Sequence, residues 1–336
     1  MSKLWTWIIG IVKKWRIKTV SKWAARNVKL PGETTMLAGR WRNKTASYQA
    51  EVMDALMQPG IRKIVIAGAS MTGKTAVIHN MMMYLIAKKP APMMYLLPTQ
   101  GIAEEYSRRR VRALFELCGA VKEKVEATGS DRNRQMIVFH EGFLQVMGVT
   151  MPSHWMGRPY KYLFMEDIDR YPGIIGNVGD PVNIAEGKTH LFYDKKIVAS
   201  GTPGRKEYRL ESEYLRGTQE HWHKRCPKCR KYVDIKWSQI HFNYEVIEKG
   251  RYRITGVKWE CPHCEGMSSE RDVKRAKGKW VAKRPDVLGI RSFWFNGLLS
   301  PWNKWDVLAK RFLEAMGDEE KMRFFFDSVI GTSIGE

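Results

Sequence analysis

The feature that most constrains the fold is an eight-residue glycine-rich segment that starts at Gly68. The segment reads Gly68-Ala69-Ser70-Met71-Thr72-Gly73-Lys74-Thr75 and fits the pattern G-x-x-x-x-G-K-[ST] at every fixed position. An apolar run at 63–67 predicts a strand before it, and residues 76–88 predict a helix after it. The glycines let the backbone curl so that its N–H groups face phosphate oxygens. The chain is therefore predicted to bind a nucleoside triphosphate.

Most residues of this segment are predicted nucleotide contacts. Lys74 places a positive charge at the β- and γ-phosphates and is a predicted catalytic residue, while Thr75 offers its hydroxyl to Mg²⁺. ATP and Mg²⁺ are the cofactors that this chemistry requires. The predicted contacts are Gly68, Ser70, Met71, Thr72, Gly73, Lys74 and Thr75.

A pair of acidic residues follows a second apolar strand at 162–165. Ligands bind at the carboxyl ends of strands in open α/β sheets, so Glu166 and Asp167 are expected at the phosphate site. By position Glu166 meets Mg²⁺, directly or through a water, and Asp167 acts on the attacking water. The usual order is Asp before Glu. Reversal displaces each carboxylate by one methylene, and catalytic geometry is sensitive to about 1 Å. The sequence leaves open whether the reversed pair is fully active.

A further strand at 195–199 ends in Ser200-Gly201-Thr202 and a proline. A small hydroxyl residue at a strand end beside the γ-phosphate is able to report the presence of that phosphate to distant parts of the protein. The same residues also describe a plain turn. Because the segment follows the acidic strand, we interpret Ser200, Gly201 and Thr202 as a coupling motif.

The alternation of strands and helices predicts an α/β fold of the P-loop NTPase, RecA-like class. Its sheet should be mostly parallel, with helices on both faces. Four segments are expected. They are a basic, Trp-rich N-terminal arm at 1–45, a P-loop ATPase core at 46–219, a zinc-ribbon module at 220–285, and an aromatic and helical segment at 286–336 that completes the ATPase region.

Four cysteines lie in two Cys-Pro-x-Cys pairs. Two tight turns of this kind present four thiolates to Zn²⁺ in a tetrahedron, which fills its coordination sphere and makes the site structural. Redox disulfides and an iron–sulfur cluster are the alternatives. The predicted zinc ligands are Cys226, Cys229, Cys261 and Cys264.

The charge of the chain indicates its partner. There are 57 Lys and Arg against 35 Asp and Glu, a formal net charge of +22. A surplus of this size favours nucleic acid, then a membrane surface, over a merely solvated basic face. No apolar run approaches the roughly 20 residues of a membrane-spanning helix. Residues 4–12 are apolar but run into basic residues, and we interpret them as part of an amphipathic arm rather than a signal peptide.

Taken in order, the motifs resemble the large terminase subunit of lambda-like phages. The resemblance covers most of the chain, from about residue 23 to the end, and its pieces are Gly39-Arg40-Trp41, Tyr48-Gln49-Ala50-Glu51-Val52-Met53-Asp54, the P-loop, Leu97-Pro98-Thr99, Glu166-Asp167-Ile168-Asp169-Arg170-Tyr171-Pro172, Gly179-Asp180-Pro181-Val182, Ser200-Gly201-Thr202-Pro203, the cysteine pairs, Asn296-Gly297-Leu298-Leu299-Ser300-Pro301-Trp302 and Ile330-Gly331.

The resemblance implies an ATP-driven motor that moves double-stranded DNA into a procapsid. It implies that Tyr48 and Gln49 contact adenine. The implied partners are double-stranded DNA, the portal of the procapsid, a small terminase subunit and further copies of the chain in a ring. No membrane partner is expected, and the expected location is the host cytoplasm.

The chain departs from this family in its late acidic residues. The family continues into a metal-dependent nuclease, but no second cluster of carboxylates is evident after residue 300. The acids there are spaced as helix-surface charges, at Asp306, Glu314, Asp318, Glu319, Glu320 and Asp327. We expect no nuclease domain and no nuclease activity from this chain, with the nuclease either a separate polypeptide or lost.

Two other functions share parts of this pattern. A helicase-like remodeller would use the same P-loop, acids and coupling motif, but little room remains for a second RecA-like domain. A nucleic-acid-binding module without packaging or catalysis would carry the reversed acids as a dead site. The arginine that completes the active site is left open among Arg108, Arg158 and Arg205.

Overall fold

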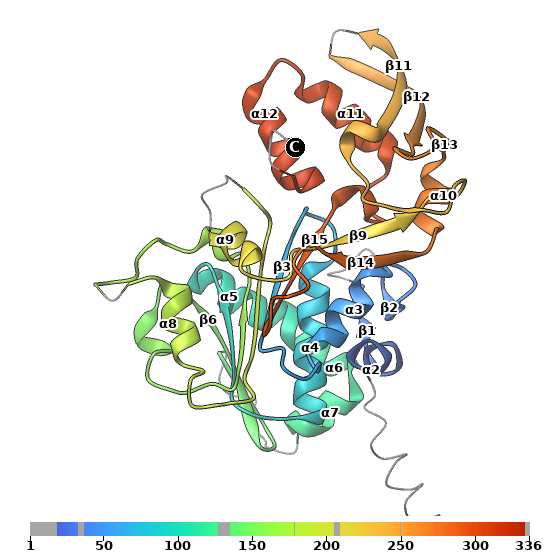
Figure 1. Ribbon diagram of the computed structural model, residues 1–336. Helices are drawn as coiled ribbons and strands as arrows, with labels where there is room; N and C mark the ends of the chain where they lie inside the picture. The colour runs from blue at the N-terminus through green and yellow to red at the C-terminus, as the bar shows by residue number, and fades with distance from the viewer. Residues whose placement is uncertain are drawn as a thin grey trace, which may run out of the picture.

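The computed structural model describes residues 19–32, 37–126, 135–177, 179–204, 209–248 and 250–332. Its centre is a ten-stranded sheet in the order β10-β9-β15-β3-β8-β7-β4-β6-β5, with β14 also paired to β9. Figure 1 labels β3, β15, β9 and β14 of this sheet near the middle of the molecule. The strands are β3 (Lys63–Gly68), β4 (Met93–Leu97), β5 (Met136–Phe139), β6 (Gly142–Gly148), β7 (Tyr162–Met165), β8 (Lys196–Gly201), β9 (Glu220–Arg225), β10 (Tyr232–Val233), β14 (Gly278–Ala282) and β15 (Ile290–Phe295).

The middle of the sheet is parallel. The neighbours from β9 through β15, β3, β8, β7 and β4 to β6 all run in one direction. Antiparallel pairing occurs only toward the edges, at β5, β10 and β14. Every residue of β3, β4 and β7 is buried, as expected of parallel strands covered on both faces. The predicted mostly parallel sheet is confirmed.

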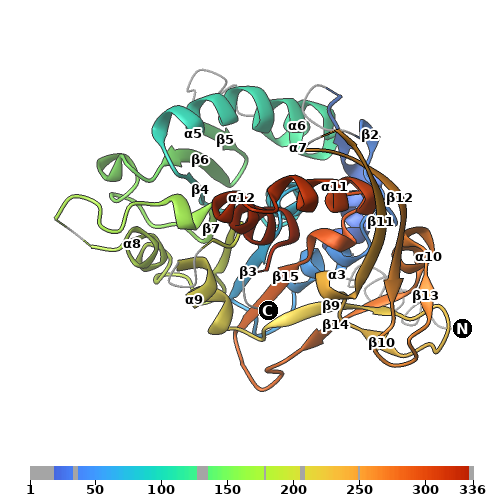
Figure 2. The same ribbon diagram turned by 90° about the horizontal axis from the view of Figure 1, so that it is seen from above.

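Helices cover both faces of the sheet. Because successive residues of a strand point to opposite faces, each central strand contributes side chains to two hydrophobic cores. Ile64 and Ile66 of β3 lie in one hydrophobic core with the helices α2, α3, α4, α6 and α7. Val65 and Ala67 lie in the other core, with α8 and α9 on the far side of the sheet (Figure 2). These helices are α2 (Val20–Asn27), α3 (Tyr48–Ala55), α4 (Lys74–Lys88), α6 (Arg112–Leu117), α7 (Gly119–Glu126), α8 (Pro181–Gly187) and α9 (Arg209–Leu215).

The helix expected at 102–118 is interrupted. It consists of α5 (Gln100–Tyr106), a π-helical turn η1 (Ser107–Val111) and α6. A π turn inserts an extra residue per turn and is frequent at functional sites. The turn rotates the arginines that follow Tyr106 relative to a regular helix. The remaining short elements on this side are the pair β1 (Lys29–Leu30) and β2 (Gly39–Arg40).

Residues 220–285 are joined to the central sheet more closely than the sequence indicated. The expected boundary falls at the start of β9, yet β9, β10 and β14 extend the sheet beyond β15. Trp222 and Trp280 pack edge to face and share the main core with Phe293 and Phe295. The other elements of this range are η4 (Trp237–Gln239), β11 (Ile240–Glu248), β12 (Arg251–Glu260), β13 (Met267–Ser268) and α10 (Glu270–Arg275).

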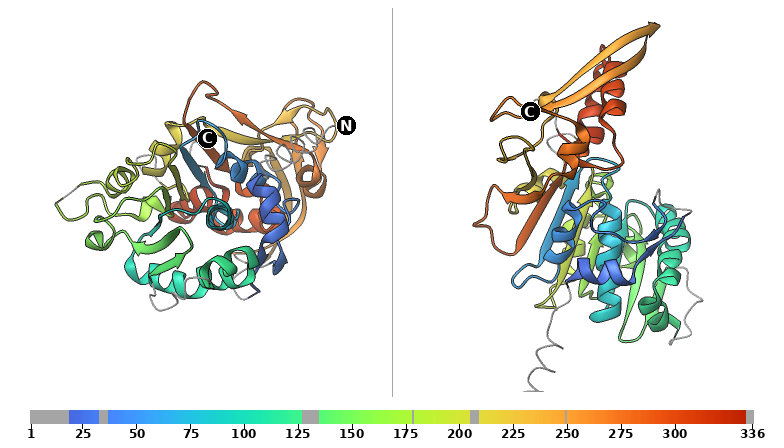
Figure 3. Two further views of the ribbon diagram at one scale, coloured as in Figure 1. Left: turned by 90° about the horizontal axis from the view of Figure 1, so that it is seen from below. Right: turned by 90° about the vertical axis from the view of Figure 1, so that its right-hand side faces the viewer.

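The strands β11 and β12 form a long two-stranded ribbon that projects from the body (Figure 3). Beside its base lie the last helices of the chain, which are packed through Trp237, Phe312 and Phe325. These helices are α11 (Trp305–Ala315), α12 (Glu319–Phe324) and the π-helical η6 (Phe325–Ile330). The amphipathic arm predicted for residues 4–12 lies outside the described residues. Within the described part of the chain, no helix is long and apolar enough to cross a membrane.

Candidate active site and metal centre

The phosphate loop connects β3 to α4, and its shape depends on two glycines. Gly73 caps the start of α4 with φ +81°, a conformation in which other residues are strained. A Cβ atom at Gly68 would come within 2.4 Å of the carbonyl oxygen of Phe295 on β15. The strand, loop and helix predicted from the sequence are therefore present, with the loop at the carboxyl end of β3.

The loop is held in its curled form by surrounding side chains. The Tyr48 hydroxyl and the Gln49 amide both donate to the carbonyl of Thr72, at 2.8 and 2.9 Å. The Thr72 hydroxyl donates to the Ala69 carbonyl at 2.7 Å, and the Ser300 hydroxyl donates to the Met71 carbonyl at 2.6 Å. A loop fixed in this way is preorganised, so less ordering is required when a ligand binds.

The Lys74 ammonium group joins the loop to the predicted coupling motif. Its Nζ donates to the carbonyls of Gly68 and Ala69 at 2.8 and 2.7 Å, and to Oγ1 of Thr202 at 3.2 Å. Burial lowers the pKa of Lys74 to about 8, against the opposing effect of the nearby Asp167 and Glu166 charges. The ammonium group of Lys74 thus lies among carbonyl and hydroxyl oxygens, at the position where the phosphate groups of a nucleotide are expected to bind.

A cavity of about 600 Å³ opens beside the loop and α4. This size suits a nucleotide. Of the predicted contacts, Met71, Thr72, Gly73, Lys74, Thr75 and Gln49 line it. Tyr48 does not, because its side chain is buried behind the loop and bonded to Thr72. Gly68 and Ser70 also lie outside the cavity wall. The remaining wall residues are Leu30, Leu37, Ala38, Gly39, Arg40, Trp41, Arg42, Thr45, Ala76, His79, Arg110, Leu114 and Trp302.

Glu166 lies where the sequence predicts a Mg²⁺ ligand. Its carboxylate accepts hydrogen bonds from the hydroxyls of Thr75 and Tyr95. The side chain is 8% exposed, and burial raises the pKa of Glu166 while the two hydroxyls and Lys74 oppose that rise. A carboxylate and a hydroxyl at the end of the phosphate loop are the oxygen ligands that Mg²⁺ takes, so this donor set fits the ion.

Asp167 differs from its neighbour in environment. Its φ of 54° places its backbone in the left-handed region directly after β7. The side chain is 39% exposed and lies 3.8 Å from Arg170. It is also close enough to Lys74 to influence the pKa of that lysine. A carboxylate that water can reach beside the phosphate loop suits the role predicted for Asp167.

The two acids should respond differently to neutralisation. Glu166→Gln should weaken binding of Mg²⁺–ATP about tenfold or more relative to metal-free ATP, since it removes a ligand charge. Asp167→Asn should keep the dissociation constant within about twofold and lower turnover at least about a hundredfold, since orienting water matters mainly in the transition state. Calorimetry and single-turnover kinetics measure the two effects. Wild-type turnover in Asp167→Asn would show that the two roles are assigned in the wrong order.

The predicted coupling residues reach the same place from β8, which lies between β3 and β7. Ser200 is paired with Ile66 and Gly201 with Ala67 across the two strands. The Ser200 hydroxyl is buried and has no hydrogen-bond partner among the described residues. With Thr202 bonded to Lys74, this segment contacts both the phosphate loop and its strand.

A cluster of three ring-bearing side chains next to Glu166 was not predicted from the sequence. The Tyr95 and Tyr106 hydroxyls lie 3.2 Å apart, and the Tyr106 hydroxyl lies 2.9 Å from Nε2 of His79. Burial lowers the pKa of His79 to about 3, so this ring is neutral at pH 7. Arg110, in the π turn, stacks over Tyr106 at 5.3 Å and lines the cavity.

Of the three arginines named from the sequence, the two that the structure describes do not line this cavity. Arg108 is exposed and is not on the cavity wall. Arg158 contacts Met136 and Phe143 near the opposite edge of the sheet. Arg205 lies outside the described residues. Arg110, two positions after Arg108, lines the cavity, as do Arg40 and Arg42.

The four paired cysteines come together at one point. Their Sγ atoms all lie within 4.8 Å of one another, with Cys226 and Cys264 at 4.0 Å and Cys229 and Cys261 at 3.8 Å. Four sulfurs bound to one Zn²⁺ at about 2.3 Å would be separated by about 3.8 Å. A disulfide requires about 2.05 Å, and all four cysteines are free. The donor set therefore fits Zn²⁺, and these four cysteines form no disulfide in the described structure.

Comparison with known families agrees with this geometry. The model described as "Phage terminase large subunit gpA, ATPase domain" matches residues 35–280. A second model, "Terminase large subunit gpA, endonuclease domain", matches residues 290–334. The expectation that a nuclease domain is absent is therefore not confirmed.

Individual relatives are distant. The large terminase subunit of Escherichia phage lambda is 20% identical over 354 aligned positions, which cover 94% of this chain and 52% of the phage protein. The chain thus spans about half the length of that relative. The ATPase domain of the Thermus phage P74-26 large terminase has a TM-score of 0.46 at 12% identity, over 82% of this chain and 92% of that domain. The large terminase of a thermophilic bacteriophage in complex with ADP has a TM-score of 0.37 at 16% identity, over 51% of this chain and 42% of that protein.

Proposed function

This chain belongs to the gpA family of phage terminase large subunits, and on that premise we propose that it is the ATP-driven motor that moves double-stranded DNA into a procapsid. The observation that carries the proposal is the meeting of Lys74, the Thr75–Glu166 pair and Thr202 at the carboxyl ends of the central strands β3, β7 and β8. This arrangement brings together a phosphate-binding site, a pair of metal ligands and the predicted coupling motif. A binding module without catalysis would not need all three.

In the proposed reaction, each residue has one task. The loop N–H groups and Lys74 bind the phosphates and neutralise charge that develops as the γ-phosphate is transferred to water. Thr75 and Glu166 would hold Mg²⁺, which screens phosphate charge when bound. Asp167 accepts a hydrogen bond from the attacking water and orients it. Thr202 is bonded to Lys74 before ATP binds, so a γ-phosphate that draws Lys74 away would change the contacts of β8.

The proposed partners follow from family membership and charge. A net charge of +22 favours sequence-independent contact with the DNA backbone. The procapsid portal, a small terminase subunit and a ring of identical chains are the further partners that we propose, in the host cytoplasm. The structural role of Zn²⁺ at the four cysteines is part of the same proposal. A helicase-like remodeller is the less favoured alternative.

We propose further that the chain hydrolyses ATP without cutting DNA. Three of its late acids form ion pairs within helices of the described structure, whereas Asp327 is buried and is not the helix-surface charge that its spacing predicted. Asp318 caps α12 and pairs with Lys321 at 2.9 Å, Glu319 pairs with Arg323 at 3.0 Å, and Glu314 lies 3.7 Å from Lys310. The nuclease match at 290–334 makes this the part of the proposal that most needs a direct test.

DNA binding and cleavage are measured together. Binding of labelled duplexes of unrelated sequence should have similar dissociation constants and should weaken about a thousandfold or more between 50 and 200 mM salt if six or more phosphates are contacted. Plasmid incubated with the same preparation in Mg²⁺ or Mn²⁺ should stay intact. Cleavage that disappears when one of the late acids is substituted would show a nuclease site in this chain. Strong sequence preference with a shallow salt dependence would favour the binding-module alternative.

A further inference from the structure

The motif at residues 296–302 has no role in the proposed reaction of Lys74, Glu166 and Asp167. It comprises Asn296, the short helix η5 (Gly297–Leu299) and the turn that ends at Trp302. The turn lies directly against the phosphate loop, although Ser300 and Met71 are 229 residues apart in the sequence. This contact places an aromatic side chain from the end of the chain at the nucleotide site.

The indole of Trp302 forms part of the cavity wall next to Gly73. A Cβ atom added to Gly73 would lie 3.3 and 3.4 Å from two carbons of the indole six-membered ring. The same Cβ would lie 2.2 Å from Nε2 of Gln49, so Gly73 leaves room for the Gln49 amide, and the ring lies in close contact beside it. The indole is partly exposed, and its exposed surface faces the same cavity that Gln49, Lys74 and Thr75 line.

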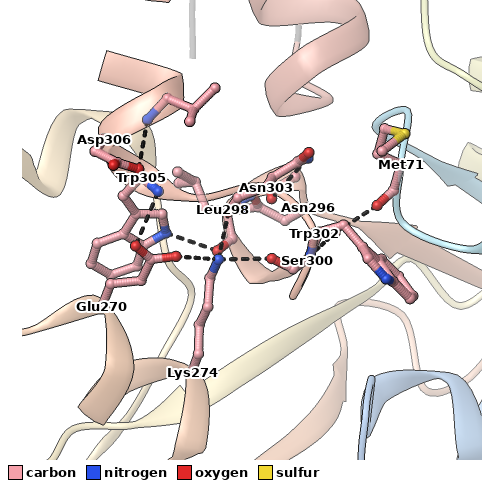
Figure 4. A network of polar contacts seen from close by, with 12 residues as sticks. Met71, Glu270, Lys274, Asn296, Leu298, Ser300, Trp302, Asn303, Trp305 and Asp306 are labelled. Atoms are coloured by element: carbon pink, nitrogen blue, oxygen red, sulfur yellow. Dashed lines mark hydrogen bonds and ion pairs between the residues drawn. The ribbon is translucent and has the colours of Figure 1, made fainter. Parts of the chain in front are cut away.

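A polar network holds this turn in place. The Ser300 hydroxyl donates to the Met71 carbonyl at 2.6 Å and accepts from the backbone N–H of Trp302 at 3.2 Å. From the other side, Lys274 of α10 donates to the carbonyls of Ser300 and Asn303 at 2.7 and 2.6 Å. Figure 4 shows Ser300 between Lys274 and the phosphate loop, with the Trp302 side chain on the loop side.

Lys274 is itself fixed. Its Nζ lies 2.6 Å from Oε1 of Glu270, and Oε2 of the same glutamate accepts from the backbone N–H of Trp305 at 3.1 Å. The Lys274 side chain is only 15% exposed. The turn that carries Trp302 is thus hydrogen-bonded on both flanks.

We propose that Trp302 is a nucleobase platform, a flat apolar surface on which the adenine or ribose of the bound nucleotide packs, and that Ser300 and Lys274 position it. The proposal rests on the proposed function, because it requires the triphosphate to occupy the phosphate loop. A base attached to phosphates on that loop would extend into the 600 Å³ cavity, which Trp302 and Trp41 both line. Indole rings stack on any base, so the platform contributes affinity for nucleotides over inorganic phosphates.

The test compares ATP with inorganic tripolyphosphate, which retains the phosphates and lacks the base. Calorimetric titration of the full chain with each ligand gives the two dissociation constants. Trp302→Ala and Trp302→Leu should weaken ATP binding roughly fivefold to a hundredfold and change tripolyphosphate binding less than about twofold. Leucine keeps apolar packing against Gly73 but has no ring face. Trp302→Phe should retain most of the ATP affinity.

Matched controls separate the possible failures. Tyr193→Ala removes an aromatic side chain that is 84% exposed and remote from the cavity, and it should change neither constant. Ser300→Ala should reproduce part of the Trp302 defect for ATP if positioning matters. Two results would overturn the proposed role of Trp302 but not the proposed function. One is that Trp302→Leu weakens the binding of ATP and of tripolyphosphate equally. The other is that Trp302→Leu binds ATP as the wild type does while Lys74→Ala binds it less well. Absence of ATP binding by the wild-type chain would overturn the proposed function as well.

Discussion

Lys74→Ala is expected to lower ATP turnover at least about a hundredfold, because a positioned charge at a developing negative charge contributes about 2.7 kcal/mol or more to catalysis. The fold should survive. Among the described residues its Nζ donates to the carbonyls of Gly68 and Ala69 and to Thr202, and burial already disfavours its charge, as the pKa of about 8 indicates. Steady-state phosphate release at saturating ATP measures the loss, and thermal unfolding tests the fold.

The matched control for this variant is Lys88→Ala. Lys88 is an exposed lysine at the opposite end of α4, far from the phosphate loop, so its loss removes the same charge from the same helix. Its turnover should equal that of the wild type. Undiminished turnover in Lys74→Ala would remove the assignment of the phosphate loop.

Metal removal is expected to produce the largest loss of stability. Structural zinc in small sites contributes on the order of 10 kcal/mol to folding, which is comparable with the whole free energy of unfolding of a domain. Cys226 and Cys261 are buried in the main core, and β9 connects the site to the central sheet. Chelation should therefore loosen the cysteine turns and β11 to β13 first and then spread along β9 and β14.

Elemental analysis should find one zinc per chain. After chelation, hydrogen exchange should rise first in the cysteine turns and β11 to β13, and then in β9 and β14. Cys226→Ser should abolish zinc binding. Cys118→Ala is the control, because Cys118 is buried in the same core but lies outside the cluster, and its zinc content should be unchanged. A metal-free preparation with the wild-type unfolding temperature would contradict a structural zinc site.

The parts of the site that could be predicted are motifs formed by residues that are close together in the sequence. The phosphate loop, the acidic strand and the cysteine turns each combine a local backbone geometry with fixed residue types, so their spacing is visible in the sequence. The walls of the cavity are different. Trp41, Arg110 and Trp302 reach it from three distant segments, and only tertiary packing brings them together. For Arg110 even the helical spacing misleads, because the π turn shifts its direction.

The boundary near residue 220 was hard to see for a related reason. Four cysteines within a basic stretch dominate the pattern and indicate a separate zinc module. The alternation in β9, however, buries Glu220, Trp222 and Lys224 and leaves His221 and His223 on the other face. The buried face of this strand carries two charged residues, so the apolar/polar alternation that marks a strand in a sequence is missing. Its partners β14 and β15 lie far along the chain, so the pairing could not be read locally.

The most direct test of the central claim is ATP turnover by the purified chain with and without duplex DNA. Duplexes of unrelated sequence should stimulate turnover to a similar extent. The stimulation should fade as salt rises, since phosphate contacts release counterions, and it should be absent from Lys74→Ala. Turnover that is undetectable, or that no duplex changes at any salt concentration, would contradict a DNA-translocating motor.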